Sequence, residues 1–420
     1  MTNLLKQRIE EANEKVLKIL QEAELIWVGD KKAIDVVPNL KSNIIMHAGP
    51  PIEYERMAGA MKKAVLGAVV FEGFTDDLAE AEELVKNGTI ILKPCHDFYT
   101  VGGMTGVTSP SMYVHVVRNE RFGNEAYCMP HEGGSFKGLG WGTNDEETIN
   151  KVRWMQEELS PVLDEAVKKV GGLNVKQIVA QAMQMGDECH SRCTAGTQIM
   201  TKMLAPYMTE LDYDKAVIKR VFEFLDANNI FFLHVIMAAA RAMIDPAKNI
   251  PYSTVVTTFA RNGVEFGIKV SALGDKWFTA PSPKIKTVFF SPKWNDDVAT
   301  PDMGDSAITE TVGLGGQITV CSPAQEYFLG GNYESALRNT LEAYEISVGE
   351  NSAWAIPNLD FRGGPAGVDI RKVVQKGIRP TIHTATAHVE GGFIGGGEAK
   401  VPMKCFEDAM MEFAQQCDIK

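Results

Sequence analysis

The chain has 420 residues, and 42 lysines and arginines against 54 aspartates and glutamates leave a formal net charge of −12. With 45% hydrophobic and 23% charged residues, the composition excludes a disordered or low-complexity chain. The negative charge and the lack of a basic run argue against nucleic acid as a partner, because phosphate backbones are bound by clustered cations. A small anionic ligand is compatible with this balance, since it needs only a few cations in a pocket.

Cysteine spacing and the N-terminal residues predict the compartment. The seven cysteines are scattered and offer no disulfide framework. The N-terminal segment is charged from Lys6 onward and has no apolar stretch typical of a signal peptide. The longest apolar run, residues 230–240, contains His234 and is shorter than the roughly 20 residues that cross a bilayer. We therefore expect a reduced, cytoplasmic protein with no membrane partner.

The first 142 residues have the pattern of an α/β fold. Apolar residues three and four apart predict an amphipathic helix over residues 4–24. A second helix, which Thr75 would cap, is predicted over 75–86. Short apolar runs predict strands at 24–28, 43–46, 64–71 and 89–92. This alternation predicts a doubly wound, Rossmann-like parallel sheet, with ligands at the carboxyl ends of its strands.

The rest of the chain divides into a helical and a mixed part. Residues 144–245 have mostly helical periodicity. Asn262-Gly263, between two apolar runs, predicts a β-hairpin. We therefore expect a multidomain protein with three parts: an α/β domain with glycine-rich loops at 1–142, a helical domain at 143–248 and an α+β domain at 249–420.

The densest cluster of reactive side chains lies between Gly186 and Gly196. If this segment is helical, Asp187 and His190 share one face, and Glu188 and Arg192 form a pair four residues apart. A carboxylate one turn from an imidazole suits general acid–base catalysis, and an arginine binds carboxylate or phosphate. These four residues are the candidate catalytic residues; the alternative is a capped, salt-bridged helix start.

Two sequence patterns could indicate a metal or a cofactor, but neither is a complete motif. Cys189 and Cys193 lack the second half of a zinc motif, so apolar packing is favoured and no metal is predicted. The glycine-rich segments match neither a P-loop nor a dinucleotide fingerprint, so no cofactor is predicted.

Candidate substrate-binding residues follow predicted strands or lie in glycine-rich and hairpin turns. They are His96, Asp97, Gly102, Gly103, Arg261, Asn262, Asp305 and Glu310. Turns, a solvated hairpin edge around Arg261 and a helix cap at 304–310 are the structural alternatives.

Several distinctive segments carry a family resemblance along nearly the whole chain. They are PCHDFYTVGGMTGVTSPSM, HEGGSFKGLGWG, MGDECHSRCTAGT, ARNGVEFGIKVS and GDSAITETVGLGG. With these, the chain resembles the YlbE-like family of bacterial proteins. The resemblance implies a subunit of oxamate carbamoyltransferase in anaerobic allantoin breakdown, alongside an FdrA-like protein, itself similar to the succinyl-CoA synthetase α chain, and a third subunit. The implied reaction is phosphorolysis of oxalurate to oxamate and carbamoyl phosphate.

This reaction gives the candidate residues roles. We expect His190, oriented by Asp187, to move a proton while Arg192 and Arg261 hold anionic groups. His96 is expected to line the same cleft. A homo-oligomer is also expected.

The site differs from that of ordinary carbamoyltransferases. Their Ser-x-Arg-Thr-Arg loop has no counterpart here; the nearest string is Ser191-Arg192-Cys193-Thr194. Two alternatives therefore stay open. One is a non-catalytic scaffold that positions an FdrA-like partner, with a large apolar patch and no closed pocket near 187–192. The other is an acyl-CoA- or acyl-phosphate-dependent enzyme with a groove at 102–106.

Overall fold

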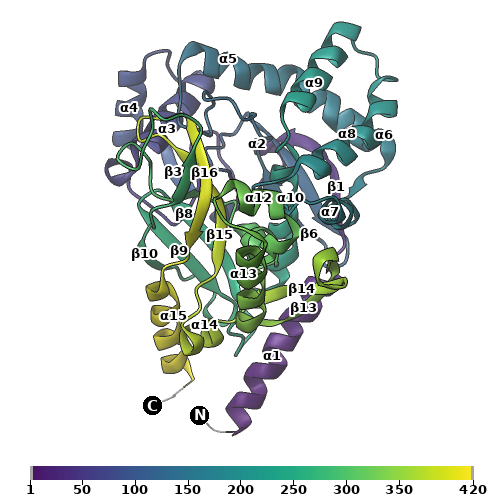
Figure 1. Ribbon diagram of the computed structural model, residues 1–420. Coiled ribbons are helices and arrows are strands. Elements are labelled where there is room, and N and C mark those ends of the chain that lie inside the picture. The colour runs from purple at the N-terminus through teal and green to yellow at the C-terminus, as the bar shows by residue number, and fades with distance from the viewer. Residues whose placement is uncertain (1–2, 418–420) are drawn as a thin grey trace.

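Helices and short sheets alternate along the chain in the computed structural model, which describes residues 3–417 (Figure 1). Fifteen α-helices and five sheets within this range confirm a mixed α/β fold. The helices are α1 Asn3–Glu22, α2 Ala33–Val36, α3 Gly59–Phe71, α4 Leu78–Lys86, α5 Glu146–Trp154, α6 Ser160–Val170, α7 Val175–Gln184, α8 Thr194–Met208, α9 Lys215–Ala227, α10 Phe232–Ile244, α11 Ile308–Thr311, α12 Pro323–Phe328, α13 Tyr333–Ile346, α14 Ile370–Lys376 and α15 Met403–Gln416. The strands are β1 Leu25–Lys32, β2 Ile44–His47, β3 Ile91–Pro94, β4 Thr100–Val101, β5 Tyr113–Asn119, β6 Asn124–Cys128, β7 Leu173–Asn174, β8 Val256–Asn262, β9 Glu265–Val270, β10 Phe278–Pro281, β11 Lys286–Phe289, β12 Met303–Gly304, β13 Ser347–Ile356, β14 Arg362–Val368, β15 Thr381–Ala387 and β16 Phe393–Lys400.

The N-terminal sheet is mainly antiparallel, with strand order β4-β6-β5-β1-β7. Strand β1 runs antiparallel to both β5 and β7, while β2 and β3 pair with each other in a separate parallel ribbon. The doubly wound parallel sheet predicted from the sequence is therefore not what forms. One cause is the run 64–71, predicted as a strand, which lies in helix α3 and is largely buried. A helix buried on most sides has no polar stripe, so it reads like a buried strand.

Side-chain caps and turns fix several predicted elements. The carboxylate of Asp77, rather than Thr75, caps α4 by accepting the backbone N–H groups of Ala79 and Glu80. The predicted hairpin is confirmed as β8 and β9, whose turn places Gly263 at φ +80°. Only glycine adopts such a conformation without strain, which explains the Asn-Gly turn.

Helix α10 runs through the largest apolar cluster, and every residue of the helix except His234 is buried. It packs against β5 and β6, and the segment after β6 returns beside it. The same cluster includes side chains from α1, α6, α8 and β13, so it draws on all three predicted parts of the chain. Figure 1 shows α10 near the middle of the molecule. The boundaries at 142 and 248 stay predictions.

Within residues 3–417, no single helix is both long and apolar enough to cross a membrane. One pair of consecutive helices, 215–227 and 232–247, reaches that length and composition only across a bend of 77°.

Candidate active site

A cavity of about 160 Å³ lies beside α10 and is lined by residues from distant parts of the chain. Three histidines, His131, His190 and His234, contribute to its wall together with Ser191 and Ser306. Aromatic side chains form another part of the wall: Trp141, Phe290, Phe328 and Phe393. The cavity therefore combines titratable groups with an apolar surround, as binding and catalytic sites commonly do.

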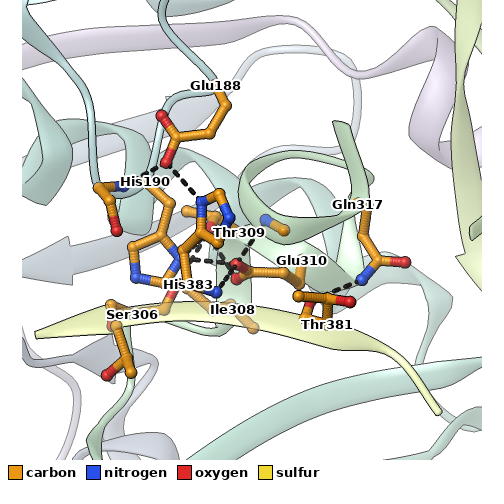
Figure 2. Close-up of polar contacts among 12 residues, drawn as sticks. Glu188, His190, Ser306, Ile308, Thr309, Glu310, Gln317, Thr381 and His383 are labelled. Carbon is orange, nitrogen blue, oxygen red and sulfur yellow. Dashed lines mark hydrogen bonds and ion pairs between the residues drawn. The ribbon is translucent and has the colours of Figure 1, made fainter. Parts of the chain in front are cut away.

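His190 is held by a buried carboxylate from α11 (Figure 2). The Nδ1 atom of His190 lies 2.7 Å from Oε1 of Glu310, and the Thr309 hydroxyl donates to Oε2 of the same carboxylate at 2.9 Å. Burial on its own raises the pKa of Glu310, but the charge and hydrogen bond of His190 outweigh it and hold this pKa below its usual range. Because Nδ1 is engaged, Nε2 is the ring nitrogen of His190 that is left for a ligand.

A glycine turn makes room for this pair. Gly315 has φ +60°, and a Cβ atom there would lie 2.3 Å from Oε1 of Glu310 and 2.9 Å from Cβ of His190. The next residue, Gly316, donates its N–H to the same carboxylate oxygen at 3.0 Å. Any larger residue at 315 would displace the carboxylate that orients His190.

The segment around His190 is a loop, so the condition under which Asp187 and His190 would share one helix face is not met. Helix α8 begins only at Thr194, and Cys189 adopts φ +66°, a left-handed conformation that interrupts a helix. The carboxylate of Glu188 accepts the backbone N–H groups of Ser191 and Arg192 and thereby closes a turn.

This loop separates the residues that the helix would have aligned. Asp187 accepts the backbone N–H of Gly196 at 2.9 Å, and its other oxygen lies 3.4 Å from Nε of Arg192. Burial raises the pKa of Asp187 to about 7. Glu310, and not Asp187, therefore orients His190, and Arg192 pairs with Asp187 instead of Glu188.

A second carboxylate–imidazole pair lies next to the first (Figure 2). Oε1 of Glu188 lies 2.9 Å from Nδ1 of His383 on β15, and both side chains are fully buried. Burial alone disfavours both charges, but the pairing outweighs it, so the pKa of Glu188 is lowered and that of His383 is raised. His383 also donates its backbone N–H to Glu310 at 3.2 Å, which joins the two pairs. No sequence pattern pointed to His383.

Arg261 and Asn262 are buried rather than on a solvated edge. The Arg261 guanidinium forms two hydrogen bonds with Asp302, at 2.9 and 3.0 Å, and a third with the carbonyl of Gly304 at 2.7 Å. Asn262 donates to the carbonyl of Pro50 and accepts two backbone N–H groups of the hairpin turn. Arg261 does not line the cavity. Its donors are therefore engaged by the protein itself.

His96, Gly102 and Asp305 do come together, but none of them lines the cavity. Asp305 accepts the backbone N–H of Gly102 at 3.1 Å, and one of its oxygens lies 3.4 Å from Nε2 of His96. Burial lowers the pKa of His96 to about 4, so this imidazole is neutral. Gly103 lines the cavity itself, whereas Asp97 lines a separate hollow. The expectation that His96 lines the same cleft as His190 is therefore wrong.

Two cavity histidines were missed by sequence reasoning. His234 reads as a core residue because it interrupts an apolar run, and His131 lies in a glycine-rich segment without a motif around it. Among residues 3–417, no group of three or more histidine, cysteine, aspartate or glutamate side chains could hold a metal ion. Burial raises the pKa of Cys189 and of Cys193, so these thiols are protonated.

Comparisons with known proteins place the chain in a family. The family model described as oxamate carbamoyltransferase subunit AllG matches residues 90–306. The chain belongs to the AllG family. The "Oxamate carbamoyltransferase subunit AllG" of Escherichia coli is 39% identical over 416 residues, which cover 98% of this chain and 99% of that protein.

Two further proteins are similar to this chain over nearly its whole length. The "Uncharacterized protein YahG" of Escherichia coli is 42% identical over 414 residues, covering 98% of this chain and 87% of that protein. A crystal structure of a conserved protein of unknown function from Enterococcus faecalis superposes with a TM-score of 0.95 at 42% identity. That match covers 98% of this chain and 99% of the crystallised one, so the two proteins share a fold over nearly their whole length.

Proposed function

We propose that this chain is a subunit of a carbamoyltransferase complex that converts oxalurate and phosphate to oxamate and carbamoyl phosphate in allantoin breakdown. Similarity to the AllG subunit supports the reaction class. The observation that carries the proposal is the cavity residue His190, held at 2.7 Å by the buried carboxylate of Glu310. An imidazole oriented in this way accepts a proton at Nε2 and returns it, which is the proton traffic this reaction requires.

In this proposal, a phosphate oxygen attacks the carbamoyl carbon and the carbon–nitrogen bond to oxamate breaks. Nε2 of His190 takes the proton of the attacking phosphate and passes it to the departing nitrogen. Glu310 stabilises the imidazolium between the two transfers, as carboxylates do in other acid–base pairs. The hydroxyl groups of Ser191 and Ser306, which also line the cavity, are suited to donate hydrogen bonds to the oxyanion that develops on the carbamoyl oxygen.

We further propose that the site is completed by the other subunits, an FdrA-like protein and a third chain. The substrates are anions, yet none of the described residues that line the cavity is lysine or arginine. Phe290 and Phe328, also in the lining, are 51% and 43% exposed, and exposed aromatic side chains are enriched at subunit interfaces. A partner that presents an arginine or lysine at this aromatic edge would supply the missing charge.

Two other readings have less support. A pure scaffold would have no closed pocket near residues 187–192, whereas His190 and Ser191 line a partly open cavity that contains titratable and aromatic side chains. An acyl-CoA-dependent enzyme needs a groove for adenine beside residues 102–106, where Gly103 and Met104 line the cavity. The similarity to a protein described as an oxamate carbamoyltransferase subunit favours carbamoyl transfer instead.

The test is carbamoyl phosphate formation from oxalurate and phosphate, with the purified chain alone and then with its two partners. We expect activity only in the mixture, and a loss of at least 100-fold in kcat when His190 is replaced by asparagine, which keeps an Nδ1-like donor but lacks Nε2. No activity in the mixture, or full activity of His190→Asn, contradicts the proposal.

A further inference from the structure

The two remaining histidines of the cavity, His131 and His234, have opposite hydrogen-bonding roles at their Nε2 atoms: one donates and the other accepts. The backbone N–H of Gly133 donates to Nδ1 of His131 at 3.0 Å, so this nitrogen carries a lone pair and the proton of the neutral ring is on Nε2. Nδ1 of His234 lies 2.6 Å from the carbonyl oxygen of Met129 and must donate to it, so Nε2 of His234 carries the lone pair. One ring therefore offers a donor at Nε2 and the other an acceptor.

Both rings are neutral, which preserves this polarity. Burial lowers the pKa of His131 well below its usual range and that of His234 to about 3. The two ring centroids are 4.7 Å apart and the rings are nearly perpendicular, at 78°. Both residues line the cavity, and because each Nδ1 is bonded to the backbone, Nε2 is the nitrogen left to each ring.

A glycine keeps the acceptor accessible. A Cβ atom at Gly103 would lie 2.5 Å from Nε2 of His234, closer than any side chain can approach. Gly103 also lines the cavity, so a side chain at this position would cover the acceptor nitrogen of His234. The backbone conformation does not explain this glycine, because Gly103 does not have a positive φ angle. Its close approach to His234 does explain it.

We infer that His131 and His234 form a recognition site for a primary carboxamide. Such a group presents a carbonyl acceptor and an N–H donor on one edge, which is the complement of the His131 donor and the His234 acceptor. A carboxylate offers two acceptors and a methyl ketone lacks the donor, so both leave His234 unpaired. The carboxamide is either that of oxamate or that of the carbamoyl group; this choice, but not the site, rests on the proposed function.

Two pairs of small ligands test the inference on the chain assembled with its two partners, because the proposed function assigns the cations that hold these anions to those partners. Oxamate is compared with pyruvate, and carbamoyl phosphate with acetyl phosphate, by calorimetry; each pair replaces only the amide NH₂ with CH₃. Leaving a buried acceptor unpaired costs a factor of roughly 5 to 150 in affinity, so we expect the amide to bind at least about fivefold more tightly in one or both pairs. The pair that shows the preference identifies which carboxamide is bound.

Substitutions test which histidine is responsible for the preference for the amide. In His234→Asn the side-chain amide can still donate to Met129, as Nδ1 does, but the Nε2 acceptor is lost, and we expect the preference to fall below twofold. His234→Gln extends its amide to the Nε2 position and should restore the preference. His131→Asn, which keeps an acceptor for Gly133 but lacks the Nε2 donor, is the second variant in case the first does not fold. It should also weaken binding of both members of a pair, since both have the carbonyl.

The inference is overturned if neither pair shows a preference, if no ligand binds, if the preference survives in His234→Asn, or if His131→Asn binds both members of a pair as tightly as wild type does. A complex without carbamoyltransferase activity whose chain nevertheless prefers the amide would remove the proposed reaction and leave the carboxamide site in place.

Discussion

Replacing Glu310 with glutamine removes the charge that faces His190 while keeping the size of the side chain and an acceptor oxygen. Nδ1 of His190 lies 2.7 Å from the carboxylate, and both side chains are buried. For charge centres roughly 4 Å apart, the attraction between an imidazolium and this carboxylate is about 4 kcal/mol at an effective dielectric constant near 20. The neutral amide keeps the hydrogen bond to a neutral ring but loses most of this attraction once the ring is protonated. Since about 1.4 kcal/mol corresponds to a factor of ten, we expect kcat to fall roughly 100- to 1,000-fold.

The assay is the initial rate of carbamoyl phosphate formation by the assembled complex at saturating substrates, with a thermal melt of each variant. Asp30→Asn is the matched control, because Asp30 pairs with His115 at the same 2.7 Å and both side chains are fully buried, but neither residue lines the cavity. The control should lose stability and keep kcat within about threefold of wild type. A loss of less than tenfold in Glu310→Gln, or equal losses in both variants, would refute the role assigned to this pair.

Three further predictions concern neighbouring groups. Arg261→Met leaves its buried carboxylate partner unpaired and should lower the free energy of unfolding by about 3–5 kcal/mol in a denaturant melt; a normal melt with a raised KM would make Arg261 an anion clamp after all. Because the pKa of His383 is raised and that of Glu188 lowered, their pair stabilises the fold between these two values, and this stability is lost as the pH rises through the raised pKa of His383. Melting temperatures measured above pH 6.5 should therefore fall less steeply in Glu188→Gln than in wild type, and parallel curves would contradict this. Gly315→Ala should cost at least tenfold in kcat, whereas Gly330→Ala, where φ is +79° and a Cβ meets nothing within 4 Å, should keep normal activity.

Predictions from short sequence patterns are confirmed where contacts between nearby residues decide the structure. The helices between 144 and 245 and the β8–β9 hairpin follow from apolar periodicity and from the Asn-Gly turn. The same reasoning failed at 64–71, where burial on most sides removes the polar stripe of a helix, and at 187–193, where hydrogen bonds from backbone N–H groups to Glu188 favour a turn. At 64–71 the tertiary structure buries the helix, and a single sequence does not display this. At 187–193 the deciding hydrogen bonds are local, but the helical spacing of Asp187 and His190 does not reveal them.

The candidate site shows the same contrast between residues that a local pattern identifies and partners that lie far away in the sequence. His190 was found from its polar neighbourhood, but its carboxylate partner lies 120 residues away, and the residues of the second pair, Glu188 and His383, are 195 residues apart. Each pair joins the loop before α8 to the C-terminal part of the chain, across the boundary predicted at residue 248. A fragment that ends there would retain His190, Ser191, His131 and His234 without the carboxylate that orients His190. The geometry of the candidate site therefore depends on the folding of the whole chain. This dependence is why composition and spacing named His190 and Glu310 as separate candidates but did not pair them.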